Sequence, residues 1–143
     1  MNFINLGEKQ SEARENKQRK IDLFGTDNFR SWMLYFVPGD GTDMHYHASP
    51  ETFLVVEGTG TVKGIKGDER PVKKHDVLFL GAKDYYQITN TGTEPLVLFG
   101  NRSEAFGGAH ILADGKDRNQ VDIERATRYR TTAESIDKPG VSD

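Results

Sequence analysis

The sequence predicts an all-β domain, a sandwich or barrel built from short strands. Fifteen glycines are spread along the chain, and they separate short runs rich in Val, Leu, Ile, Phe and Tyr. Such residues favour strands, and the Gly, Pro and Asn residues between the runs are typical of turns. The spacing of the runs matches that of antiparallel β proteins. With 143 residues and no internal repeat or linker, the chain is expected to form one domain, 1–143, with a substantial core.

Residues 1–20 are interpreted as an N-terminal arm. The initial "NFINL" is compatible with an edge strand. The following "EKQSEARENKQRK" is charged throughout and has no apolar stripe. A segment of this kind is typical of a solvated helical turn or loop. The alternative is an arm that closes over a pocket or over a partner subunit.

Five runs between about residues 30 and 100 are the expected core of the barrel. Each is rich in aliphatic or aromatic residues and ends at turn residues: "SWMLYFVPG", "TFLVVEG", "DVLFLG", "YYQITNTG" and "PLVLFGN". The segment "IKGDERP" between Val62 and Val72 predicts a hairpin tip. Another turn is expected at 90–95, because "NTGTEP" supplies turn-forming residues and Pro95 opens the next strand.

The strand pattern becomes weaker after Gly100. One more short strand is expected around His110–Leu112. Residues 113–143 are polar and are interpreted as a C-terminal extension with a flexible end. Within it, "QVDIERATRY" is compatible with a short helix.

Composition narrows the classes of function. A net charge of −3 offers no electrostatic reason to expect a nucleic-acid or membrane partner. The chain has no cysteine, so a metal would have to bind through imidazole, carboxylate, phenolate or water. The N-terminus lacks the apolar centre of a signal peptide, and no apolar run reaches membrane-spanning length. A cytoplasmic location is therefore expected.

The stretch "GDGTDMHYHASPETFLVVEGTG", residues 39–60, contains a candidate metal site. Side chains alternate along a strand, so His45 and His47 point to the same face and can bind one ion. Pro50 is expected to break the strand, and a hairpin would then bring Glu51 opposite the imidazoles. Two nitrogens and one carboxylate on one face leave coordination positions open and accept divalent Fe, Mn, Ni or Zn. The alternative is an ordinary hairpin with solvent-facing histidines.

The spacing within this stretch also follows a family motif. Gly39 is followed by five residues, His45-x-His47, three residues, Glu51, six residues and Gly58. These positions and spacings resemble the first motif of the cupin superfamily, in its small single-domain bacterial form. The resemblance covers about residues 30–100. It implies a double-sheet jelly-roll barrel whose interior holds a metal.

The second motif of that family is matched only in part by "HDVLFLGAKDYYQITN", residues 75–90. Asn90 fits, whereas His75, Gly81 and Lys83 stand where the family has Gly, Pro and Gly. Tyr86 stands where the family has its last metal-binding histidine.

Three roles are open to Tyr86. Its phenolate could serve as a ligand, for which its pKa must fall from about 10. Its hydroxyl could stand beside the metal as a general acid or base, or orient the substrate. Its ring could simply pack in the core. By strand alternation, Tyr86, Ile88 and Asn90 share one face.

Four further residues are considered as possible parts of the site. His75 lies in a charged turn and is expected at the surface. His110 could close a pocket or sit at a subunit contact. Arg30 and Arg102 flank the barrel strands and could meet an anionic substrate, but they are expected to be solvated, as most arginines are.

These features favour a metal-dependent enzyme that acts on a small oxygen-rich molecule. In the leading hypothesis, Lewis-acid chemistry with Tyr86 as acid or base gives a lyase, dehydratase or isomerase. An iron(II)-dependent dioxygenase is the alternative, disfavoured because the last histidine of the second motif is missing. A non-catalytic barrel that binds a small ligand is a second alternative. The family resemblance also implies a homodimer, joined through an edge strand or a swapped N-terminal segment.

Overall fold

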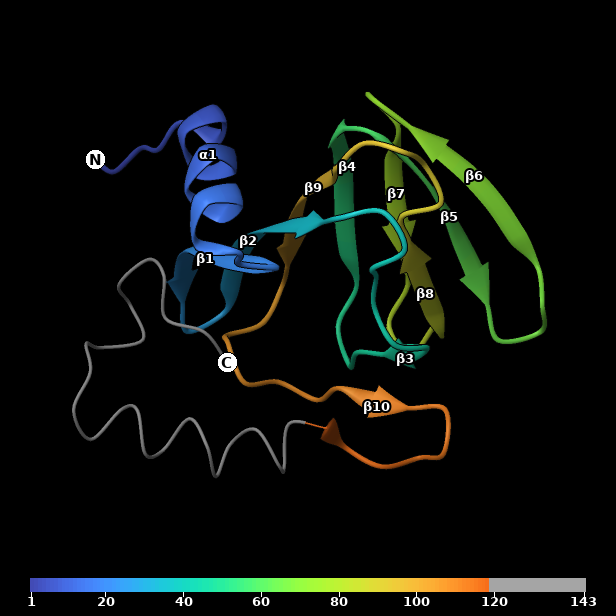
Figure 1. The fold of residues 1–143 in the computed structure, drawn as a ribbon. Coiled ribbons are helices and arrows are strands. Elements are labelled where there is room, and N and C mark those ends of the chain that lie inside the picture. The colour runs from blue at the N-terminus through green and yellow to red at the C-terminus, as the bar shows by residue number, and fades with distance from the viewer. Residues whose placement is uncertain (119–143) are drawn as a thin grey trace.

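The computed structural model describes residues 1–118, and the helix expected within "QVDIERATRY" lies outside them. The described chain consists of one helix and two five-stranded antiparallel sheets that face each other (Figure 1). The all-β fold class is therefore confirmed. Within residues 1–118, no helix is both long enough and apolar enough to cross a membrane.

The first sheet has the strand order β1-β2-β9-β4-β7. Its strands are β1 (Lys20–Thr26), β2 (Phe29–Phe36), β9 (Leu96–Arg102), β4 (Glu51–Glu57) and β7 (Val77–Leu80). Four of them were expected from their apolar runs. Strand β1 was not, because part of it faces the barrel with polar residues: Lys20 and Asp22 lie opposite Leu34 and Trp32 of β2.

The second sheet has the strand order β10-β3-β8-β5-β6. Its strands are β10 (Ile111–Leu112), β3 (His45–Tyr46), β8 (Tyr86–Thr89), β5 (Thr59–Gly64) and β6 (Glu69–Lys73). The predicted hairpin between Val62 and Val72 is confirmed as the β5–β6 pair. The predicted short strand after the barrel is confirmed as β10, which pairs with β3.

Strand alternation separates two apolar cores. Along β2, Trp32, Leu34 and Phe36 face the barrel interior, where they pack with Phe53 and Tyr86 among others. The intervening Met33 and Tyr35 face away from the barrel and belong to a second cluster. Both faces of β2 are therefore covered, which explains its unbroken apolar run.

The N-terminal arm contains α1 (Leu6–Asn16), which covers the outer face of the first sheet (Figure 1). The edge strand considered for "NFINL" is wrong, because Asn5 caps the helix by accepting a hydrogen bond from the backbone N–H of Glu8. Within the helix, only Ala13 is fully buried, and the small contact face explains the missing apolar stripe. Ile4 and Leu6 add partly buried contacts to the second cluster.

The two glycines that bound the first motif have backbone reasons for their identity. Gly39 and Gly58 adopt φ values of +88° and +85°, a region that strongly favours glycine. At Gly58, a Cβ atom would also collide with the carbonyl oxygen of Pro95. This close approach accompanies the irregular register between Val55 and Glu57 in the β4–β9 pair.

Candidate metal centre

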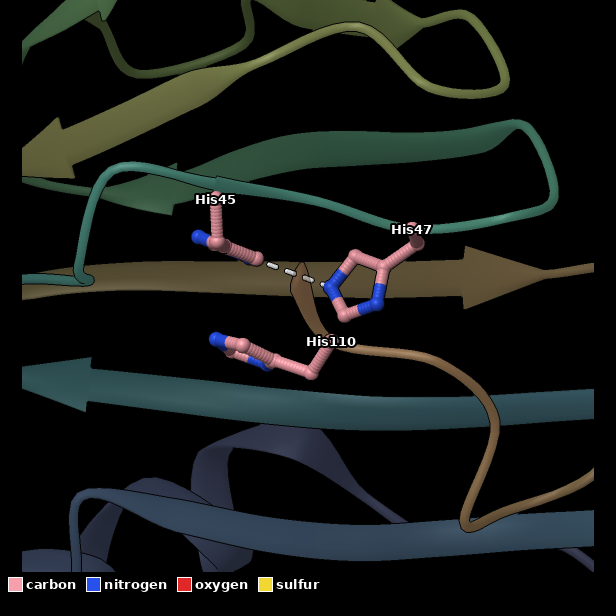
Figure 2. A group of neighbouring side chains, drawn as sticks. All are labelled: His45, His47 and His110. Carbon is pink, nitrogen blue, oxygen red and sulfur yellow. Dashed lines mark hydrogen bonds between the residues drawn. The ribbon is translucent and has the colours of Figure 1, made fainter. Parts of the chain in front are cut away.

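Three imidazoles gather at one end of the barrel interior. His45 opens β3 and His47 follows that strand, and both are at least nine-tenths buried. His110 immediately precedes β10, whose antiparallel pairing with β3 brings it back beside them. Candidate ligand atoms of the three residues lie within 4.8 Å of one another. Figure 2 shows the three side chains close together, with the His110 ring stacked on that of His45 at 4.1 Å between centroids.

Backbone carbonyls orient two of these rings. Nδ1 of His45 lies 2.7 Å from the carbonyl oxygen of Asp43, and Nδ1 of His47 lies 2.7 Å from that of Ala109. A carbonyl only accepts hydrogen bonds, so each Nδ1 is the protonated nitrogen in a neutral ring. Both Nε2 atoms then carry lone pairs. A hydrogen bond from the ring nitrogen that does not bind the metal is the usual means of orienting a ligating histidine.

The two Nε2 atoms face each other at 3.0 Å (Figure 2). With both Nδ1 atoms protonated, no proton lies between the two lone pairs, and the contact is repulsive unless a cation is shared. Two nitrogens bound to one ion at 2.0–2.1 Å and at right angles to each other would be about 3.0 Å apart. The donor pair therefore fits a transition metal. The buried Nε2 of His110 also has no hydrogen-bond partner among the described residues.

Electrostatics keep the three imidazoles in the form that binds metals. Burial lowers the pKa of His45 from 6.5 to about 4, with Arg102 adding to the effect. Burial, then Arg102, lowers the pKa of His47 still further. The pKa of His110 is also lowered, first by burial and next by His45. All three are neutral at pH 7, as ligation requires.

Glu51 begins β4 and is buried, with its carboxylate bound to Arg102. Its Oε2 atom accepts hydrogen bonds from Nε of Arg102 at 2.9 Å and from Nη2 of the same guanidinium. Its Oε1 atom is buried without a hydrogen-bond partner in the described structure. Glu51 is not a member of the three-histidine group defined above, so its role as a ligand stays a prediction.

Tyr86 occupies the barrel interior as strand alternation predicted, together with Ile88 and Asn90, all three buried. It lies directly opposite His45 in the β3–β8 pair, with 4.4 Å between ring centroids. Burial, and then the negative charge of Glu51, raise the pKa of Tyr86 well above 10. The surrounding protein groups therefore hold Tyr86 as a neutral phenol, which disfavours a phenolate ligand.

A cavity of about 230 Å³ adjoins the three histidines. Its walls include Trp32, Leu34, Phe36, Phe53 and Tyr86. The expectation of solvated Arg30 and Arg102 is wrong, because both also line this cavity and each is only 3% exposed. They face the interior because β2 and β9 place them opposite each other, in step with the inward-facing Trp32. His75 lies at the surface, as expected.

Residues 32–99 match the model of the cupin domain. The barrel of this chain is a cupin domain. The two facing sheets are accordingly the double-stranded β-helix, or jelly roll, of that superfamily, with α1 added at the N-terminus.

The chain is also similar to a curated plant protein. It is 30% identical over 82 residues to auxin-binding protein 1 of Arabidopsis thaliana, a match that covers 52% of this chain. The match covers only 41% of the plant protein, so the chain spans less than half the length of that relative.

Solved structures agree on the fold. TT1209 from Thermus thermophilus has a TM-score of 0.61 at 19% identity, covering 73% of this chain and 98% of that one. A cupin 2 conserved barrel domain protein from Salinispora arenicola has a TM-score of 0.54 at 20% identity, covering 60% and 75%. The DMSP lyase DddQ from Ruegeria pomeroyi has a TM-score of 0.55 at 15% identity, covering 64% and 46%. At these identities the likeness concerns the fold alone.

His110 is the residue that sequence reasoning undervalued. It lies outside the cupin match, 63 residues after His47, and local strand periodicity says nothing about such a distance. The one available signal was its position directly before a short apolar run in a chain with four histidines. The β3–β10 register turns that position into a third imidazole at the site.

Proposed function

We propose that this chain is a metal-dependent cupin enzyme whose ion is held by His45, His47 and His110. The observation that carries the proposal is the 3.0 Å approach of two Nε2 atoms whose Nδ1 partners are backbone carbonyls. A divalent Fe, Mn, Ni or Zn ion suits three neutral imidazoles. When bound, it would supply Lewis acidity toward a carbonyl, carboxylate or hydroxyl oxygen.

Glu51 is retained in the proposal as a further donor through Oε1. Its other oxygen is already held by Arg102, so one oxygen remains for an ion. The same pairing offsets the negative charge of Glu51, which makes it a weaker donor than an unpaired carboxylate. We therefore rank its contribution to metal affinity below those of the histidines.

Tyr86 is proposed to transfer a proton to or from the substrate. Its side chain lines the cavity next to His45, and the negative charge of Glu51 acts on its hydroxyl. Trp32 and Phe53 belong to the same apolar cluster, so the ring of Tyr86 has surroundings of low polarity. In this role Tyr86 donates a proton to a leaving oxygen or orients a substrate hydroxyl, which suits lyase, dehydratase or isomerase chemistry.

One observation favours an iron(II) dioxygenase as the second candidate. The main objection was the tyrosine at the last histidine position of the second motif, and His110 supplies a third imidazole from elsewhere. Oxygen uptake by the iron-loaded chain, measured with candidate substrates, separates the two reaction classes. A third candidate, a non-catalytic ligand-binding barrel, is supported by the similarity to a protein named for binding auxin.

Metal analysis of the full chain, purified without chelator, tests the proposal. We expect about one equivalent of a divalent transition metal, lost in His45→Ala and His47→Ala and weakened in His110→Ala. His75→Ala is the matched control, because it removes an exposed imidazole away from the site. Absence of metal in every preparation, or equal losses in the His75 control, would refute the metal centre.

A second measurement addresses Tyr86. Iron(III)-loaded protein should show no phenolate charge-transfer band, and Tyr86→Phe should keep full metal occupancy. A band that disappears in Tyr86→Phe would instead establish ligation and exclude the proton-transfer role proposed here.

A further inference from the structure

The cavity beside the metal centre has a strongly basic lining. The described residues that line it include five basic side chains and one carboxylate, Asp43; the basic residues are Arg19, Lys20, Arg30, Arg102 and Arg118. Several of these bases have acidic partners: Arg19 pairs with Asp40, Lys20 with Asp22, Arg102 with Glu51 and Arg118 with Asp43. Of these carboxylates, only that of Asp43 lines the cavity. A ligand entering it therefore meets mainly cationic groups.

The innermost cations form an ordered row. Arg30, Arg102 and Glu51 lie directly opposite one another on β2, β9 and β4. The guanidinium carbons of both arginines lie 4.9 Å from the centre of the Trp32 ring. Both side chains are 3% exposed, so contacts with that ring and with the strands hold two planar guanidinium groups in a buried place beside the same ring. Guanidinium groups bind carboxylates through two parallel hydrogen bonds.

The proposed metal ion adds to this positive charge. Its three imidazole donors are neutral, and the charge of Glu51 is offset by Arg102. Two positive charges on the ion would therefore remain to be balanced beside a basic wall. Cations concentrated in a site of low dielectric favour an anionic ligand over a neutral one of the same shape.

The size and the other walls of the cavity limit the ligand further. A volume of about 230 Å³ is roughly that of seven or eight water molecules at about 30 Å³ each. The apolar part of the lining includes Leu34 and Phe36, further along β2 from Arg30, and Phe53 on β4 of the same sheet. A ligand that fits therefore has one anionic group and a small apolar body.

We propose that the cavity selects small organic carboxylates and that Arg30 is the specificity-determining residue that receives the carboxylate. Arg102 is engaged by Glu51 and by Glu104, so its main part is to hold the wall in place. Arg30 has five N–H donors, enough to serve a ligand together with other partners. The inference rests on the proposed function, because it names the substrate class of the same site.

Isothermal titration of the full chain, loaded with Zn²⁺, with acids and their uncharged amides tests this selectivity. The probes are benzoate against benzamide and acetate against acetamide, which differ in charge and little in shape. We expect each acid to bind roughly ten- to hundredfold more tightly than its amide, as one charge-assisted contact allows. Equal affinities for acid and amide would overturn the proposal without involving any variant.

Two substitutions locate the preference. Arg30→Gln should lower the acid-to-amide ratio by about tenfold, and Arg30→Lys should retain part of it. Arg70→Gln is the matched control, because Arg70 is an exposed arginine on β6 that does not line this cavity. An equal loss in the Arg70 variant would show a general charge effect and overturn the role of Arg30. If circular dichroism shows that Arg30→Gln does not fold, the acid-to-amide affinity ratios of the wild type and of Arg30→Lys are compared instead. An unchanged ratio in Arg30→Lys would then overturn the role of Arg30.

Repeating the titrations after metal removal separates this proposal from the proposed function. A preference that persists in the chelated protein and falls in the Arg30 variants supports the basic wall, even if metal analysis finds no ion. A preference that disappears on chelation and survives in Arg30→Gln places the anion on the metal alone and overturns the role of Arg30.

Discussion

Replacing Arg102 with leucine isolates the buried ion pair that supports the site. The side chains of Arg102 and Glu51 are 2% and 1% exposed. The substitution leaves the Glu51 carboxylate buried with neither oxygen bound to a cation. Breaking a buried pair in this way typically costs about 3–5 kcal/mol. For a domain of this size the melting temperature should fall by roughly 10 °C, at about 2–4 °C per kcal/mol.

The assay is urea or thermal unfolding in the presence of EDTA, so that metal binding does not contribute. Lys74→Ala is the control, because Lys74 and Glu57 form an ion pair that is about half exposed on both sides. Exposed pairs contribute about 0–1 kcal/mol, so this control should hardly change stability.

A double variant tests the reasoning behind that magnitude. The double variant with Glu51→Leu should recover much of the loss, because it removes the uncompensated charge. A double variant no more stable than Arg102→Leu would contradict this reasoning. A loss below about 1 kcal/mol in Arg102→Leu alone would refute the argument.

Four other predictions concern the site and its surroundings. The chelated protein should lose stability as pH falls from 6.5 toward 4, because the folded pKa of His45 lies below its unfolded value. Protonation of this residue should lower the free energy of unfolding by about 3 kcal/mol, measured by urea unfolding at a series of pH values. Gly58→Ala should destabilise the chain by more than about 1 kcal/mol, measured in the same way, since it strains a positive φ and meets a backbone carbonyl. Tyr85→Phe removes a 3.2 Å hydrogen bond to the backbone of β10, the strand that follows His110. We expect metal affinity, measured in competition with a chelator, to fall by about tenfold. Unchanged affinity would contradict the idea that the position of β10 supports His110. Light scattering after size exclusion should give the mass of a homodimer, and a monomer would contradict the expectation taken from the family.

Much of the metal centre followed from local sequence. Strand alternation was enough to place His45 and His47 on one face and to turn Tyr86 inward, because both relations span only one strand. The glycines at 39 and 58 were readable for the same reason, since each answers to its own backbone conformation. The strands between about residues 30 and 100 also followed from short apolar runs ended by turns.

Contacts between strands that are far apart in the sequence could be found only from the tertiary structure. Glu51 and Arg102 are separated by 51 residues, and His47 contacts the backbone of Ala109 across 62. Only strand order and register decide which side chains meet over such distances, and one residue of slip would turn them to the other face. The sequence by itself determined a barrel with two histidines, a glutamate and a tyrosine facing inward. The packing of β10 against β3 and of β9 between β2 and β4 decided that a third histidine and two buried arginines complete the site.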